Sequence, residues 1–162
     1  MKRYEATWSV WLIGISSILT ILCLGIGIEV AQRSSGALWW AAWLPVALAL
    51  GCALFTVRGY TITPDAILVH RLLWKTRLAR AGLESARFVP HAMRWSVRTF
   101  GNGGFFSFSG FYWNKALGAY RAYVTDPART VVLHYRSSRT VLLSPAEPQA
   151  FVRELAVSNQ GA

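Results

Sequence analysis

The stretch RGYTITPDAILVH, from Arg58 to His70, marks the point where the character of the chain changes. Most of the excess of apolar residues lies before Arg58, whereas short alternating runs separated by turn residues follow it. Alternation with a period of two is typical of β-strands that bury one face, and the Pro-Asp pair within the stretch indicates a turn. The sequence therefore predicts a helical part over residues 1–58, a β-rich domain over residues 59–157 and a disordered tail over residues 158–162.

Two uncharged apolar runs precede this point, Trp8–Ile28 and Leu38–Val57. At about 1.5 Å of rise per residue, each is long enough to cross a hydrocarbon core of roughly 30 Å, and tryptophans cluster at their ends as they do at membrane interfaces. The first run exceeds the usual apolar core of a signal peptide, so we expect it to be retained as an anchor. Because the connector between the runs is short, the sequence predicts a transmembrane helical hairpin with spans at about residues 8–28 and 38–57.

Basic residues set the expected orientation of this hairpin. Lys2 and Arg3 precede the first span and several basic residues follow the second, whereas the connector contributes only Arg33. The positive-inside rule therefore places both termini in the cytoplasm, as in a multi-pass protein of the inner membrane.

The C-terminal stretch SPAEPQAFVREL predicts a helix after the last strand. Ser144 fits an N-cap, Pro145 the first helical position and Glu147 the reciprocal partner in a capping box. Phe151 and Leu155 fall on one face of this helix and form its apolar side. About seven strands followed by one amphipathic helix indicate a small barrel or bent sandwich that the helix closes.

Three segments, YTITPDAILVH, RTFGNGGFFSFSGFYWNKALGAY and VLLSPAEPQAFVREL, carry a resemblance to a known family. The chain resembles the bacterial pleckstrin-homology (PH) membrane proteins, in which a two-helix hairpin precedes a PH-like domain. The likeness covers roughly residues 59–155, and Arg98–Gly104 is its most specific part. It implies a membrane α-helical hairpin plus a PH-like β-barrel of antiparallel strands capped by a C-terminal helix.

The chain departs from that family pattern in one respect. PH domains that grip phosphoinositides usually place several basic residues around the first hairpin loop, whereas the loop here is Thr63-Pro64-Asp65, which is short and acidic. We therefore do not expect an inositol phosphate pocket of the eukaryotic type.

The glycine-rich aromatic segment between residues 98 and 113 admits three interpretations. In the first, Asn102-Gly103 and Gly104 supply positive φ in a tight turn while the aromatic rings fill the barrel. In the second, phenylalanines of the loop enter the headgroup region beside the anchor. In the third, backbone N–H groups form a nest for a lipid phosphate, with an arginine as counter-charge. The candidate residues of this loop are Arg98, Gly101, Asn102, Gly103, Gly104, Phe105 and Phe106.

A second set of candidates is basic and follows the second span. The candidate lipid-binding residues are Arg58, Arg71, Lys75, Arg77 and Arg80. The net charge of +10 suits either an anionic membrane surface or nucleic acid. Because the basic residues are scattered over strands without an RNA-binding signature, and because an anchored domain meets lipid first, we expect no nucleic-acid partner.

No pattern of catalytic residues is present. The acidic residues form no acid–base pair, and His70, His91 and His134 are far apart in the chain and lack ligand-type neighbours. No nucleophile elbow and no Walker A loop occur. We therefore expect no enzyme, no metal and no cofactor.

The function that fits these patterns is a membrane-anchored PH-like binding module that recognises anionic lipid headgroups or a partner protein at the cytoplasmic face. The alternative is a structural or assembly subunit that forms homo-oligomers, or an accessory subunit of a membrane complex.

Overall fold

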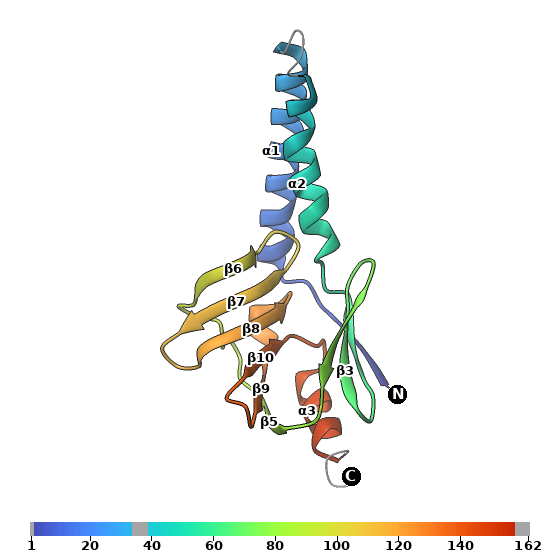
Figure 1. The fold of residues 1–162 in the computed structure, drawn as a ribbon, viewed down its shortest axis with the longest axis vertical. Helices are drawn as coiled ribbons and strands as arrows, with labels where there is room; N and C mark the ends of the chain where they lie inside the picture. Colours follow the sequence, from blue (N-terminus) through green and yellow to red (C-terminus); the bar gives the residue numbers. More distant parts are fainter. Residues whose placement is uncertain (1, 34–38, 158–162) are drawn as a thin grey trace.

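A pair of helices stands on a β-rich domain in the computed structural model, which describes residues 2–33 and 39–157 (Figure 1). The tail expected at residues 158–162 lies outside these described residues. In chain order, the elements are β1 (Lys2–Glu5), α1 (Val10–Arg33), the 3₁₀ helix η1 (Trp39–Ala42), α2 (Trp43–Leu54), β2 (Gly59–Ile62), β3 (Ala66–His70), β4 (Lys75–Ala79), β5 (Leu83–Phe88), β6 (Val97–Gly103), β7 (Phe108–Asn114), β8 (Gly118–Val124), the 3₁₀ helix η2 (Pro127–Arg129), β9 (Val131–Tyr135), β10 (Thr140–Leu143) and α3 (Pro148–Val157).

The strands form two sheets that are not closed into a barrel, so the barrel expectation is wrong in this respect. One sheet has the order β1-β2-β3-β4 and the other the order β5-β9-β10-β8-β7-β6. The chain passes from one sheet to the other at a turn in which the Leu83 N–H donates to the Arg80 carbonyl and Gly82 has a φ of +79°. The second sheet also contains a parallel pair, β8 with β10, although only antiparallel strands were expected.

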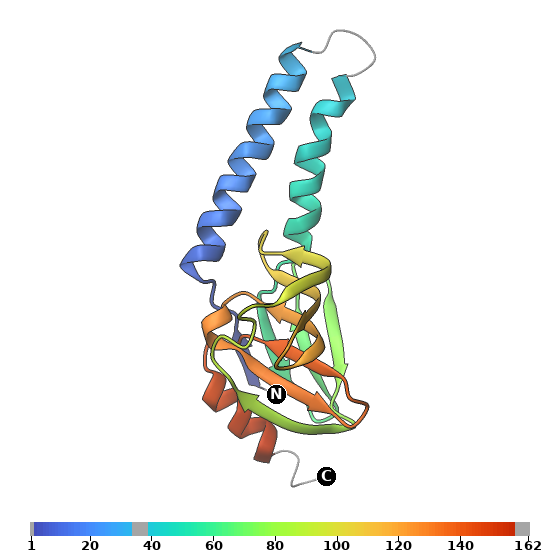
Figure 2. The same ribbon diagram turned by 90° about the vertical axis from the view of Figure 1, so that its left-hand side faces the viewer.

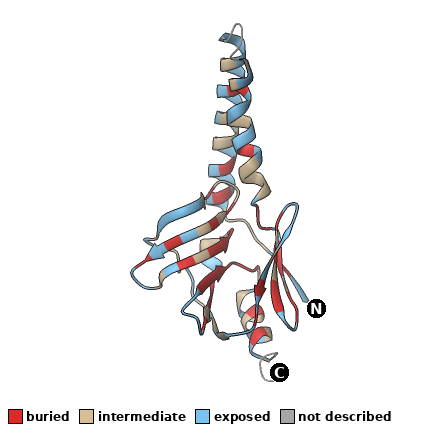
Figure 3. Ribbon diagram, in the orientation of Figure 1, coloured by how far each residue is buried: buried red, intermediate tan, exposed pale blue. Residues whose placement is uncertain are grey.

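The core lies between the two sheets and is closed by α3, as Figure 3 shows. Phe151 and Leu155 of α3 are almost completely buried, which confirms the predicted apolar side of this helix. The Phe151 ring packs edge-on against Tyr4 of β1 and Tyr60 of β2, with ring centroids 5.1 and 6.2 Å apart. The fully buried Tyr60 hydroxyl donates to the Tyr123 carbonyl of β8 at 2.6 Å, and burial raises the pKa of Tyr60 to about 12.

The predicted cap of α3 is wrong, because the helix begins at Pro148 and not at Pro145. Ser144 is completely buried between the sheets, where its Oγ accepts from the Thr125 N–H at 2.8 Å and its own N–H donates to the Tyr60 hydroxyl oxygen at 3.1 Å. Pro145 instead forms an isolated bridge with Ala6. The backbone around Pro145 therefore pairs with the N-terminal segment and does not form the first turn of the helix.

Strand β1 was not expected from the sequence. It precedes α1 and pairs antiparallel with β2, which follows α2, so that Tyr4 lies opposite Tyr60 and Glu5 opposite Gly59. A Cβ on Gly59 would lie 2.7 Å from the Tyr4 carbonyl oxygen, so glycine permits this close pairing. Both ends of the helical pair are thus held by one sheet (Figure 2).

The two helices differ in length. Helix α1 has 24 residues and is long and apolar enough to cross a membrane, and it is the one helix among residues 2–33 and 39–157 that meets this standard. Within the described residues 39–57, the second apolar run is helical over η1 and α2 and ends at Leu54, before the expected end of the span at residue 57. The helices approach closely where a Cβ on Gly27 would lie 2.9 Å from the Ala42 carbonyl oxygen.

The glycines of the β6–β7 hairpin match the prediction only in part. Gly104 has the predicted positive φ of +110°, whereas the positive φ predicted for Gly103 is wrong. The positive values belong to Gly101, Gly104 and Gly110. Gly101 and Gly110 lie opposite each other in the ladder, and a Cβ on Gly110 would lie 2.2 Å from the Phe100 carbonyl oxygen. Here glycine allows the two paired strands to approach each other closely.

Replacing Gly110 by alanine should lower the free energy of unfolding by about 1–3 kcal/mol, because the new Cβ meets backbone and the residue keeps a φ of +146°. Gly103→Ala is the matched control, since its Cβ meets only the flexible side chain of Arg98. Thermal unfolding of the full-length protein in detergent measures both. Equal effects of the two substitutions would contradict the close approach of β6 and β7 at Gly110.

Candidate functional site

The β6–β7 loop docks against the base of α1. The Phe106 N–H donates to the Ser16 Oγ at 2.9 Å, and the Phe106 ring lies edge-on to Trp8 with centroids 6.4 Å apart. The Ser9 N–H, just before α1, donates to the Thr125 carbonyl at 3.2 Å. The loop and the start of α1 therefore form one packed unit, and the loop lies beside the helix as the second interpretation of this segment requires.

The backbone N–H groups of the loop already have acceptors within the protein. Gly104 donates to the Ser107 carbonyl at 3.2 Å, and Phe105 donates to the Asn102 Oδ1 at 3.1 Å. With the Phe106 bond to helix α1, three successive amides are satisfied. The anion nest stays a prediction, and it would require these bonds to be exchanged.

Arg71 holds the end of α2. Its Nη1 donates to the Phe55 carbonyl at 2.8 Å and its Nε to the Thr76 Oγ1 at 3.2 Å. Its guanidinium carbon lies 5.3 Å from the ring centroid of Phe55 and 5.1 Å from that of Tyr123. A positive charge at the C-terminal end of a helix is favourable because the last carbonyls carry partial negative charge. Burial lowers the pKa of Arg71, and the nearby cation of Arg121 lowers it further.

The structure places the other basic candidates in different environments. Arg80 is buried, and its Nη1 donates to the Thr63 carbonyl at 3.2 Å. Arg77 is exposed and forms an ion pair with Asp65. Arg58 and Lys75 are exposed, and neither takes part in an ion pair among residues 2–33 and 39–157. Arg98 is also exposed, and its side chain lies beside Gly103.

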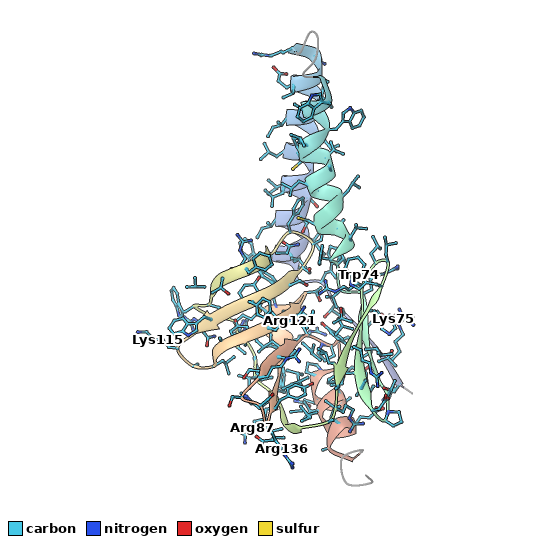
Figure 4. The ribbon with its side chains drawn as sticks, viewed as in Figure 1. Trp74, Lys75, Arg87, Lys115, Arg121 and Arg136 are labelled. Atoms are coloured by element: carbon cyan, nitrogen blue, oxygen red, sulfur yellow. The ribbon has the colours of Figure 1, made fainter. Side chains whose placement is uncertain are left out.

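The turn between β3 and β4 presents apolar side chains that the sequence analysis did not single out. Leu72, Leu73 and Trp74 are all exposed, Leu73 by 73%. Trp74 lies close to the base of the helices (Figure 4), where its ring meets Phe55 edge-on with centroids 5.2 Å apart. The run AILVHRLLW reads as one continuous strand, so its sequence pattern gives no signal of a protruding tip.

A cavity of about 490 Å³ lies between α2 and strands β6, β7 and β8. Its charged lining residues are Arg71 and Arg121, and no acidic residue lines it. Arg121 lies between two aromatic rings, 5.3 Å from the Phe111 centroid and 5.1 Å from the Tyr123 centroid. Gly101 and Asn102 from the candidate loop also line the cavity. Arg121 was missed because AYRAYV reads as an ordinary alternating strand.

Two facing sheets with a C-terminal helix against their core define a PH-like β-sandwich, preceded here by an apolar helix. The bacterial PH domain family matches residues 58–159, and the chain belongs to this family. No curated protein and no solved structure matches the chain significantly. Membership agrees with the resemblance of its three segments and identifies a binding module, since PH domains are generally non-catalytic.

The docking of the loop on α1 can be tested with Ser16→Ala. Loss of the acceptor for the Phe106 N–H should weaken this contact by about 1 kcal/mol, so amide hydrogen exchange in the loop should accelerate by about fivefold. Ser17→Ala is the control, because Ser17 is the exposed neighbour on the same helix. Hydrogen exchange of the detergent-solubilised protein, read on peptides covering residues 104–107, measures the difference. Unchanged exchange in Ser16→Ala would mean that the loop is not held by α1.

Proposed function

We propose that this protein is a membrane-anchored PH-like module that recognises anionic lipid headgroups at the cytoplasmic face of the inner membrane. The observation that carries the proposal is the convergence of three features at one end of the domain. The helices leave the domain there, the apolar tip with Leu73 and Trp74 lies beside them, and Arg58 and Lys75 flank the same strand ends.

The anchor consists of the two helices. Helix α1 is about 36 Å long at about 1.5 Å per residue, which exceeds the roughly 30 Å of a hydrocarbon core. Its apolar side chains are mostly exposed, including Ile18, Ile21 and Leu22. In a soluble protein such a surface is rare, whereas lipid chains cover it well. Together η1 and α2 form the shorter return path.

The pairing of β1 with β2 supports the proposal that both ends of the helical pair lie on the same side of the membrane. Residues 2–5 precede α1 and residues 59–62 follow α2, yet they share one ladder. A membrane cannot separate two strands of one sheet, so the helical pair has to cross and return. The excess of Lys and Arg on the domain side then favours a cytoplasmic location of that side.

The exposed basic residues at this end supply the affinity for anionic lipid. A basic side chain near an anionic leaflet contributes about 1 kcal/mol, so Arg58 and Lys75 together contribute about 2 kcal/mol. This is weak for a free domain but sufficient to select headgroups for a domain that is already tethered. Salt should reduce the preference, because exposed charges are screened.

The double variant Arg58→Gln/Lys75→Gln should therefore lose most of the preference for anionic lipid. The full-length protein is mixed in detergent with equal amounts of phosphatidylglycerol and phosphatidylcholine, repurified, and its retained lipids are quantified by mass spectrometry. Wild type should be enriched in phosphatidylglycerol at low salt, and the double variant should show an enrichment up to about 30-fold smaller.

The matched control is Arg87→Gln/Arg136→Gln, which removes the same charge from the end of the domain opposite the helices (Figure 4). This control should keep the wild-type enrichment. If both double variants lose enrichment equally, net charge and not the membrane-facing end is responsible, and the proposed site is wrong.

The orientation is tested with reporter fusions to the full-length chain. Fusions before Met1 and after Ala162 should both report a cytoplasmic location, and a reporter inserted between Ser34 and Ser35 should report the opposite side. A periplasmic signal from the C-terminal fusion would overturn lipid recognition at the cytoplasmic face.

A second candidate function, assembly through the domain surface, is favoured by exposed aromatic side chains on β6 and β7. Phe100 is 75% exposed, and its partner across the ladder, Phe111, is 48% exposed. Exposed apolar patches often mark interaction sites. Light scattering of the detergent-solubilised protein distinguishes assembly from lipid recognition. Assembly predicts that the measured protein mass is a multiple of the mass of one chain and stays so at high salt.

A further inference from the structure

We propose that the cavity between α2 and strands β6–β8 binds one anionic membrane lipid, with its phosphate against Arg121 and Arg71 and one acyl chain along α2. This inference rests on the proposed membrane location but concerns a different site from the exposed residues Arg58 and Lys75. It assigns a buried, stoichiometric lipid to the junction of anchor and domain.

The cavity exists because the two sheets differ in width. Arg121 lies opposite Val141 in the ladder, and Val141 belongs to the core between the sheets, so Arg121 lies on the inner face of the six-stranded sheet. Phe111 is paired with Arg121 and continues this inner face towards β6. The four-stranded sheet packs only against the other end of that face, since its core partners lie on β5, β8, β9 and β10. The inner face of β6 and β7 therefore remains uncovered beneath α2.

The chemistry at the bottom of the cavity fits an anion. The guanidinium carbons of Arg71 and Arg121 each lie 5.1 Å from the ring centroid of Tyr123, so two positive charges share one aromatic ring. Neither arginine has a carboxylate partner among residues 2–33 and 39–157. The Arg121 Nε is buried and has no hydrogen-bond acceptor in the described part of the chain. Arg71 is buried and Arg121 is half-buried. Burying a positive charge is costly unless a counter-charge is present, and a phosphate offers both charge and acceptors.

The walls of the cavity fit an acyl chain. The helix side consists of Ala47, Leu48, Gly51 and Cys52, which lie on one face of α2. Nothing lies within 4 Å of a Cβ placed on Gly51, so the helix leaves open space there. The opposite wall is formed by the aromatic side chains of the uncovered sheet face. Apolar walls with a few convergent polar groups are typical of ligand sites, which commonly range from about 300 to about 1,000 Å³.

The position of the cavity selects a membrane lipid over a free anion. Its apolar helix wall belongs to the pair that we propose as the anchor, and its two arginines lie where that pair meets the domain. A lipid of the adjacent leaflet could thus place its acyl chain along α2 and its phosphate at the two arginines at the same time. A free phosphate would leave the apolar wall unused.

The test is thermal unfolding of the full-length protein in non-ionic detergent at about 500 mM salt, where exposed charges are screened. Lysophosphatidylglycerol, which has one chain and an anionic headgroup, is added as the probe. A ligand that binds only the folded state raises the unfolding temperature, so wild type should be stabilised in proportion to the logarithm of probe concentration.

Two variants remove the site by different means. Gly51→Leu fills the cavity from the helix side, and Arg121→Met removes the charge at its base while keeping an apolar side chain of similar length. Both should require at least about tenfold more probe for the same shift. Without probe, Arg121→Met should unfold at or above the wild-type temperature, because an uncompensated charge is removed. Gly14→Leu is the matched control for Gly51→Leu, since Gly14 is also helical with open space around its Cβ but lies outside the cavity.

Several results would overturn the inference. Equal stabilisation of wild type, Gly51→Leu and Arg121→Met would place the probe elsewhere. An equal shift with lysophosphatidylcholine would show that binding does not require an anionic headgroup. An equal shift with inorganic phosphate would show that binding does not require an acyl chain. A dimer that Gly51→Leu converts to a monomer would mean that a second copy covers the cavity. The salt-sensitive enrichment measured with the Arg58 and Lys75 variant decides the proposed function independently, so the two can fail separately.

Discussion

The antiparallel pairing of β1 with β2 is the constraint on which the rest of the structure depends. It joins the strand before α1 to the strand after α2, so the helices and the sheet form a closed loop of chain. The Arg71 bond to the Phe55 carbonyl and the Phe106 bond to Ser16 reinforce the two corners of this loop. A domain held at both corners cannot swing freely about a single linker. Its orientation relative to the helices is therefore part of the fold.

The pattern of the sequence predicts those parts of the fold that depend on local periodicity. Phe151 and Leu155 bury the face that their spacing indicates, and the strand-rich texture after Arg58 corresponds to the two sheets. Strand β1 could not be predicted in this way, because KRYE is short and mostly charged and owes its conformation to the edge of β2. The same holds for Ser144, whose local context favours a helix cap but whose hydroxyl is taken by the distant Thr125 and Tyr60.

The candidate site shows a similar division. The sequence identifies Arg58, Lys75 and Arg71 equally as basic candidates. Only the packed structure reveals that Arg71 is buried against the ring of Phe55, whereas the other two side chains are exposed. Arg121 gave no signal, since one arginine in an alternating strand is ordinarily solvated. Its importance comes from the unequal width of the two sheets, which is a property of the assembled sandwich and not of any segment. Gly110 likewise acquires its role from the neighbouring strand β6, whose backbone lies close to it.

The position of β1 at the very start of the described chain has a consequence for synthesis. A ribosome delivers these residues before both helices, whereas their partner strand emerges only after both helices have been made. Until then the four residues of β1 have no ladder to join. Pairing becomes available only once β2, which follows α2, has left the ribosome. The β1–β2 ladder therefore forms after both helices have been made, and it joins the chain segments at their two ends.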